Sequence, residues 1–190
     1  AIPDDDDFKL GKGAGFYLNA TENKWSKNYN MYDYVVFELP KLIDENFDFS
    51  KKERGIFGHS MGGGGAIQCA IKNPSVFKSV SAFSPICSLQ KSNFAKEACQ
   101  KYLGNNIDKI NMYDPIHLIQ NNENLSNIKI DVGLKDEFLD DLYINDFEKI
   151  CEKENQKLIV NKHSGFDHGY YFIQSFIQDH FVYHSSILKN

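Results

Sequence analysis

The chain has 190 residues, of which 42% are hydrophobic and 25% are charged, proportions typical of a soluble globular protein. Its length suits a single domain over residues 1–190. The formal net charge of -5 argues against a nucleic-acid-binding protein, which needs a basic face for phosphates. No apolar run approaches the roughly 18 residues of a membrane-spanning helix, so we expect no membrane partner.

The amino-terminal segment AIPDDDDFKL has neither the basic nor the apolar region of a signal peptide. The four cysteines are scattered, with no C-x-x-C pair and no Cys/His cluster at zinc spacing. We therefore expect buried, reduced thiols, no metal site and a reducing compartment such as the cytoplasm. These cysteines are Cys69, Cys87, Cys99 and Cys151.

Residues 1–31 are rich in loop-forming residues. The run from Asp4 to Asp7 is expected to form a solvated turn, and GKGAG at 11–15 lacks the G-K-[ST] ending of a phosphate-binding loop. Farther on, short apolar runs alternate with helical patterns, which predicts a mostly parallel sheet covered by helices on both faces. The expected strands are 55–58, 79–83, 128–132 and 158–162, and the expected helices are 32–46 (with a kink at Pro40), 61–72, 94–103, 142–155 and 170–188.

The segment GHSMG at 58–62 stands between an expected strand and an expected helix, and it matches the G-x-S-x-G pattern. Exposing a serine hydroxyl at the end of a strand requires a tight turn with a strained backbone. We expect that side chains at positions 58 and 62 would collide with the neighbouring strand and helix, so that only glycine fits at Gly58 and Gly62. Ser60 is therefore a candidate nucleophile. The amide of Met61 lies in the first turn of the helix, where it can donate to a developing negative oxygen.

A nucleophilic serine needs a base, usually a histidine that is oriented by an acid, and here both should follow later strands, the acid first. Asp136 lies just past the strand 128–132, whereas Asp131 lies inside it. His168 lies in the loop after the last strand, whereas His163 is too near the end of that strand. His59, beside the serine, is expected to pack or hydrogen-bond there.

Four segments carry a resemblance to a known family, the S-formylglutathione hydrolases or esterase D family. They are GAGFYLNATENKWSKNYNMYDYVVFELPKLI, FGHSMGGGGAIQCAIKNPSVFKSVSAFSPIC, GLKDEFL and GFDHGYYFI, and the resemblance covers essentially the whole chain. It implies an α/β-hydrolase fold and a serine thioesterase that hydrolyses S-formylglutathione to glutathione and formate without a cofactor. It also implies action on simple acetyl esters.

Matched residue by residue, the resemblance places the catalytic triad on Ser60, Asp136 and His168 and an oxyanion-binding amide on Met61. It places Trp25 in the region near the acyl site, so Trp25 is a substrate-binding candidate, as is His59.

The chain departs from the family pattern in two places near the triad. Gly64 stands where the family commonly has a histidine, and Gly169 stands where it commonly has a serine. Members of the family also have a further segment before GAGF, which carries the first strands and a loop that donates the second oxyanion amide. We therefore expect this chain to be the carboxyl-terminal two-thirds of a longer protein, with one edge of the nucleophile strand left unpaired.

Two alternative functions stay open at this point. One is a general carboxylesterase with the same triad. The other is an inactive hydrolase remnant that serves as a binding module, which the absent front segment favours and the retained triad disfavours. The aromatic-rich terminal helix is compatible with a homodimer, in which a second copy would cover it.

Overall fold

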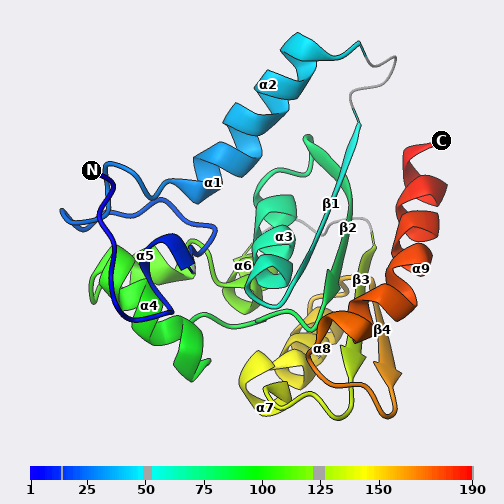
Figure 1. Ribbon diagram of the computed structural model, residues 1–190. Coiled ribbons are helices and arrows are strands. Elements are labelled where there is room, and N and C mark those ends of the chain that lie inside the picture. Colours follow the sequence, from blue (N-terminus) through cyan, green and yellow to red (C-terminus); the bar gives the residue numbers. More distant parts are fainter. Residues whose placement is uncertain (14, 49–52, 122–126, 190) are drawn as a thin grey trace.

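The computed structural model describes residues 1–13, 15–48, 53–121 and 127–189. Its centre is a parallel sheet of four strands in the order β1-β2-β3-β4 (Figure 1). The strands are β1 (Arg54–His59), β2 (Phe77–Phe83), β3 (Ile128–Gly133) and β4 (Leu158–His163). All four strands that the sequence predicts are present, and the parallel pairing agrees with the alternation of strands and helices.

Helices cover both faces of the sheet (Figure 1). Helix α3 (Met61–Lys72) packs against β1 and β2, and α6 (Pro115–Asn121) and α8 (Ile144–Lys153) continue the layer of α3. Helix α9 (Tyr170–Leu188) packs on the opposite face, against β1, β2 and β3. The bounds of α3 and α9 agree with the predicted helices 61–72 and 170–188.

The predicted helix 32–46 consists of three consecutive helical pieces, α1 (Met31–Asp33), a π-helical turn η2 (Tyr34–Glu38) and α2 (Leu39–Asn46). The amide of Leu39 donates to the carbonyl of Tyr34, five residues earlier. Pro40, the next residue, has no amide hydrogen to donate. The wider π turn therefore stands where the sequence predicts a kink.

Other elements also differ from the sequence prediction. The predicted helix 142–155 corresponds to α8, which begins later, at Ile144, because Tyr143 has a left-handed backbone with φ of 56°. This residue separates α8 from the short α7 (Leu139–Leu142). The predicted helix 94–103 is α4 (Asn93–Leu103), and it ends at Gly104 with φ of 75°. Three short helices were not predicted, namely η1 (Gly11–Gly13), α5 (Ile107–Asn111) and α6.

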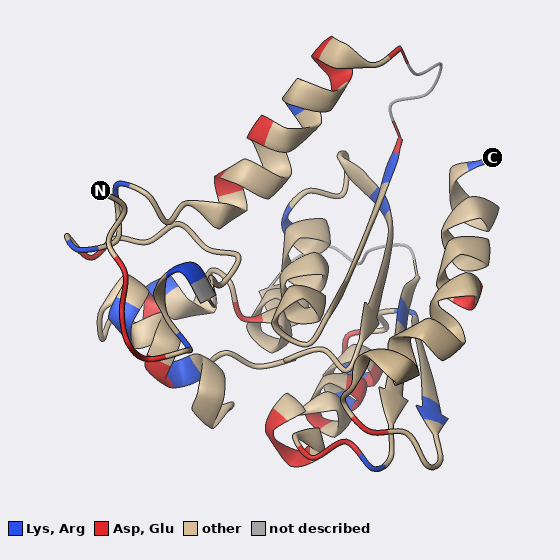
Figure 2. Ribbon diagram, in the orientation of Figure 1, with Lys and Arg blue, Asp and Glu red and all other residues tan. Residues whose placement is uncertain are grey.

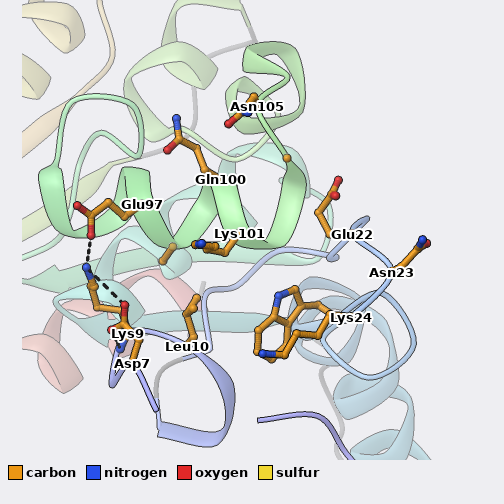
Figure 3. A pocket seen from close by; sticks show the side chains of 13 residues that line it. Asp7, Lys9, Leu10, Glu22, Asn23, Lys24, Glu97, Gln100, Lys101 and Asn105 are labelled. Atoms are coloured by element: carbon orange, nitrogen blue, oxygen red, sulfur yellow. Dashed lines mark hydrogen bonds and ion pairs between the residues drawn. The ribbon is translucent and has the colours of Figure 1, made fainter. Parts of the chain in front are cut away.

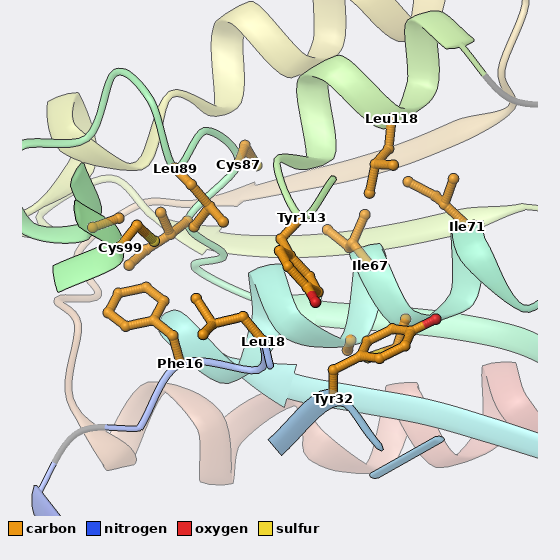
Figure 4. Packing of buried hydrophobic residues seen from close by; sticks show 14 of the residues in the cluster. Phe16, Leu18, Tyr32, Ile67, Ile71, Cys87, Leu89, Cys99, Tyr113 and Leu118 are labelled. Atoms are coloured by element: carbon orange, nitrogen blue, oxygen red, sulfur yellow. The ribbon is translucent and has the colours of Figure 1, made fainter. Parts of the chain in front are cut away.

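The main hydrophobic core lies between α3 and the segments that cover it (Figure 4). Ile67 and Ile71 of α3 face Tyr113 and Leu118, and Leu18 of the amino-terminal segment packs beside them. All four cysteines are buried and unpaired, as the sequence predicts. The exposed Asp run is held by ion pairs from Asp4 to Lys12 and from Asp5 to Lys24.

One edge of the sheet is apolar and open. Strand β1 is an outer strand, and within the described ranges no other strand pairs with its free edge. Phe57 on β1 is 43% exposed, and Phe181 of α9, which contacts it, is 58% exposed. Helix α9 carries a single acidic residue and no lysine or arginine, so this side of the molecule has little charge (Figure 2). Within the same described ranges, no helix is both long and apolar enough to cross a membrane.

Candidate active site

The candidate residues gather at one edge of the sheet because all four strands are parallel, and their carboxyl ends therefore point the same way. Ser60 follows β1 directly, Asp136 follows β3, and His168 lies in the loop between β4 and α9.

Ser60 lies on a strained turn that is held from several sides. Its backbone has φ of 56° and ψ of -118°, which a residue with a side chain rarely adopts. Its amide donates to the carbonyl of Phe83 at 2.9 Å, and its carbonyl accepts from the amides of Gly64 at 3.0 Å and Ile86 at 3.1 Å. A Cβ atom at Gly58 would lie 2.3 Å from the carbonyl oxygen of Gly62, so only glycine fits there.

The structure explains why position 64 is a glycine in this chain. A Cβ atom at this position would lie 2.3 Å from the carbonyl oxygen of Ile86, in the loop that also hydrogen-bonds to Ser60. A histidine at position 64 would therefore require this loop to move away from α3.

His168 and Asp136 form a buried pair. The ring Nδ1 of His168 lies 2.7 Å from Oδ2 of Asp136, and the Asp136 carboxylate also accepts from the amide of Phe138 at 2.9 Å. Burial by itself would raise the pKa of Asp136, but these hydrogen bonds outweigh it and hold the pKa below its ordinary value. An ionised carboxylate only accepts, so Nδ1 donates to Asp136, and Nε2 is the ring nitrogen that this pair leaves unused.

Two aromatic rings hold the imidazole of His168. The ring of His59 lies 4.4 Å from it, centroid to centroid, and the ring of Phe138 meets it edge-on at 5.0 Å. Burial, with a smaller contribution from His168, lowers the pKa of His59 to about 4. His59 is therefore neutral near pH 7 and adds no charge beside the His168 ring. Because His59 immediately precedes Ser60, this contact brings the His168–Asp136 pair next to the strained turn.

A cavity of about 540 Å³ opens at Ser60. Its walls include His59, Met61, Tyr17, Phe94 and Tyr170. Met61 begins α3, so the amides of the first helical turn have no acceptor within the helix and face this end with the positive pole of the helix dipole. This arrangement suits an anion that forms at the serine.

Cys69 also lines the cavity but is a poor competitor for the role of nucleophile. Burial raises the pKa of its thiol to about 12, so it stays protonated at neutral pH.

A second histidine–aspartate pair lies nearby, at 3.0 Å between Nε2 of His163 and Oδ2 of Asp131. Asp131 is 1% exposed and also pairs with Lys129 at 2.5 Å, and the His163 ring stacks on Phe176 at 3.7 Å. Neither member of this pair lines the Ser60 cavity. The arrangement is that of a structural ion cluster between β3, β4 and α9.

Trp25 lies away from Ser60, in a different cavity of about 640 Å³. Its ring packs edge-on against Tyr29 at 5.0 Å and Tyr102 at 5.2 Å, and it is 3% exposed. Charged side chains surround this second cavity, and Lys9 reaches both Glu97 and Asp7 across it (Figure 3). The structure therefore brings together Ser60, Met61, His59, Asp136 and His168, but does not bring Trp25 to them.

A family model named Esterase matches residues 1–183. The structure of an S-formylglutathione hydrolase from Agrobacterium tumefaciens superposes with a TM-score of 0.95 at 41% sequence identity, over 98% of this chain and 68% of the other. The chain belongs to the Esterase family. Its fold is that of the α/β-hydrolases, and it is a hydrolase of the serine esterase kind.

Two structures from Staphylococcus aureus share the fold of this Esterase family member at lower identity. A fluorophosphonate-binding serine hydrolase matches with a TM-score of 0.69 at 23% identity, over 88% of this chain and 66% of that one. An S-formylglutathione hydrolase matches with a TM-score of 0.60 at 23% identity, over 80% of this chain and 59% of that one. The chain thus spans roughly 60 to 70% of the length of these solved relatives.

The sequence did not single out several residues that surround the site of this Esterase family member. Tyr17, Phe94, Phe138 and Tyr170 contact the site from four separate segments. Only Tyr170 carried a local signal, because it closely follows His168. The others come to the site through tertiary packing, which a single sequence does not reveal.

Proposed function

We propose that this Esterase family member hydrolyses S-formylglutathione to glutathione and formate through Ser60, His168 and Asp136. The observation that carries the proposal is the His168–Asp136 pair, which packs through His59 against the strained turn of Ser60. The name of the Agrobacterium tumefaciens relative, at 41% identity, supports the choice of substrate.

In the first half of the reaction, the hydroxyl oxygen of Ser60 attacks the formyl carbon while Nε2 of His168 takes the hydroxyl proton. Asp136 keeps the ring in the tautomer that leaves Nε2 free, and it stabilises the imidazolium that forms. The carbon–sulfur bond then breaks, the imidazolium returns the proton to the sulfur, and glutathione leaves. Ser60 now carries the formyl group as an ester.

In the second half, a water molecule gives its proton to Nε2 of His168 and attacks the formyl ester. The ester bond breaks, the Ser60 oxygen regains a proton from His168, and formate leaves. The Met61 amide stabilises the oxyanion of both tetrahedral intermediates, a contribution on the order of 10²–10³ in kcat for one such donor. No step requires a metal or an organic cofactor.

The decisive experiment compares S-formylglutathione with an acetyl ester of similar size, using the protein at its natural length. We expect a higher kcat/KM for the thioester and the loss of both activities in Ser60→Ala. A rate for the ester that is higher by orders of magnitude would instead support a general carboxylesterase.

An inactive binding module is the remaining alternative, and a fluorophosphonate probe tests it. A folded protein whose Ser60 does not react with the probe, and which hydrolyses neither substrate, would support that reading. Covalent labelling of Ser60, located by mass spectrometry of the peptide, supports a working nucleophile.

The four unpaired cysteines support a cytoplasmic location, because a reducing compartment keeps thiols free. The partners in this proposal are small acyl substrates, with a second copy of the chain as the one protein partner that the exposed apolar edge favours.

A further inference from the structure

Tyr17 occupies a distinctive place on the wall of the Ser60 cavity. Its chain neighbours Phe16 and Leu18 are buried in the core, with exposures of 5% and 2%. The amide of Leu18 donates to the carbonyl of Phe16 at 2.9 Å, which makes a tight turn centred on Tyr17. Tyr17 itself is only half-buried, and it lines the cavity.

The ring of Tyr17 lies directly on α3, where a glycine makes room for it. A Cβ atom at Gly65 would lie 2.4 Å from Cδ2 of the ring, so any side chain at position 65 would displace the tyrosine. The side-chain amide of Gln68, itself 3% exposed, donates to the backbone carbonyl of Tyr17. The backbone tether and the close contact with the helix fix the position of the ring from two sides.

The phenol oxygen lies toward the amino-terminal end of α3. A Cβ atom at Gly62 would make an ordinary contact of 3.5 Å with this oxygen. Gly62 is the second residue of α3 and follows Met61 directly, so the hydroxyl lies beside the first turn of the helix that Ser60 precedes. Within the described parts of the chain, this hydroxyl makes no hydrogen bond, and it is therefore a free donor.

We propose that Tyr17 is a substrate-contacting residue, whose hydroxyl donates a hydrogen bond to the carbonyl oxygen of the bound acyl group. This inference rests on the proposed acyl transfer to Ser60. The carbonyl oxygen becomes negatively charged in the tetrahedral intermediate, so a donor aimed at it is strengthened there and acts on kcat more than on KM. The free hydroxyl has no structural task, whereas the ring below it packs on α3.

Tyr17→Phe tests this assignment because it keeps the ring on Gly65 and removes only the hydroxyl. We expect kcat for S-formylglutathione and for an acetyl ester to fall about 10- to 100-fold, with KM changed less than threefold. Tyr34→Phe is the matched control, because Tyr34 is 42% exposed and does not line the cavity. An unchanged kcat in Tyr17→Phe, or an effect on KM alone, would overturn the proposal.

The rate of Ser60 labelling by a fluorophosphonate separates this inference from the choice of substrate. The phosphoryl oxygen of the probe takes the place of the acyl oxygen while fluoride leaves, so Tyr17→Phe should slow labelling by a similar factor. Slower labelling in a protein that does not hydrolyse S-formylglutathione would overturn the proposed substrate and support the role of Tyr17. Equal labelling rates would overturn the role of Tyr17.

Gly62→Ala gives a second, independent variant. The methyl group of the alanine would lie 3.5 Å from the Tyr17 hydroxyl, an ordinary contact, so the variant should fold. The methyl group would occupy the space beside this hydroxyl, and we therefore expect a lower kcat. If both changes act on the same hydrogen bond, the double variant Gly62→Ala/Tyr17→Phe should be little slower than the slower single variant. Fully multiplicative losses would contradict a shared hydrogen bond.

Discussion

At the scale of single residues, two histidine–aspartate pairs lie near the carboxyl ends of the strands, and they differ in their surroundings. His168 packs against His59 beside Ser60, whereas His163 faces Asp131 and stacks on Phe176. We expect His168→Gln to lower kcat by about 10³–10⁴ and to leave the fold intact, because the proton acceptor is lost. His163→Gln should keep kcat within a few fold and lower the melting temperature, because it leaves a buried carboxylate with one partner fewer.

Steady-state kinetics and thermal unfolding of the two variants check this difference. The two glutamine variants serve as controls for each other, since both remove one imidazole paired to an aspartate. A large loss of kcat in His163→Gln without loss of folded protein would reassign the base, and so would retained activity in His168→Gln.

The residues that the sequence did predict at this site share a local signal. Ser60 sits in a recognisable motif, and Asp136 and His168 follow strands that could be recognised from their apolar runs. The expected collision of a side chain holds for Gly58 but is wrong for Gly62, where a Cβ atom would make only an ordinary contact of 3.5 Å with Tyr17. The contact of His59 with His168 and that of Tyr17 with Gly65 join residues far apart in the chain. Neither leaves a pattern in one sequence, because only the packing of the folded chain brings them together.

At the scale of elements, α3 and α9 have local signals in the sequence, whereas the short helices have none. Helix α3 begins at the strained serine and ends before Pro74, so both bounds were visible in the sequence. Helix α5 has five residues, too few for a periodic pattern in the sequence. The break at Tyr143 has no glycine or proline to announce it, because a tyrosine adopts the left-handed backbone there.

Helix α9 docks on the sheet through buried histidines, which makes its docking sensitive to pH. Nδ1 of His184 lies 2.6 Å from the hydroxyl of Ser79, and its Nε2 lies 2.8 Å from that of Ser81. Burial, and to a smaller extent His180, lowers the pKa of His184 to about 4. An unfolded histidine has its ordinary pKa near 6.5.

Between these two pKa values the unfolded chain binds the proton that folded His184 excludes, so the free energy of unfolding falls as the pH is lowered from 7 to 5. For His184 alone the expected loss is about 2 kcal/mol, measured by urea denaturation at a series of pH values. His184→Gln should be less stable at pH 7 but should lose less stability on acidification. Equal losses in the variant and the parent chain would mean that His184 is not the group responsible.

At the scale of the whole molecule, β1 and β4 are the two outer strands of the sheet, and the β1 edge lies beside the exposed rings of Phe57 and Phe181. Among the described residues no strand pairs with the outer edge of β1 beside Phe57, and the neighbouring Phe181 extends the apolar area. An open, apolar edge of this kind templates pairing with another chain. The solved Agrobacterium tumefaciens relative is longer, since this chain covers 68% of it.

We therefore expect a polypeptide limited to these 190 residues to self-associate through β1 at micromolar concentrations. Phe57→Lys should raise the monomer fraction, because a charge on an edge strand opposes strand pairing. Tyr171→Lys is the matched control, since Tyr171 is 75% exposed on α9 but lies outside the contact of Phe57 with Phe181. Sedimentation velocity at several concentrations measures the monomer fraction. A parent polypeptide that stays monomeric throughout, or an equal response to the two lysine variants, would show that the β1 edge does not drive association.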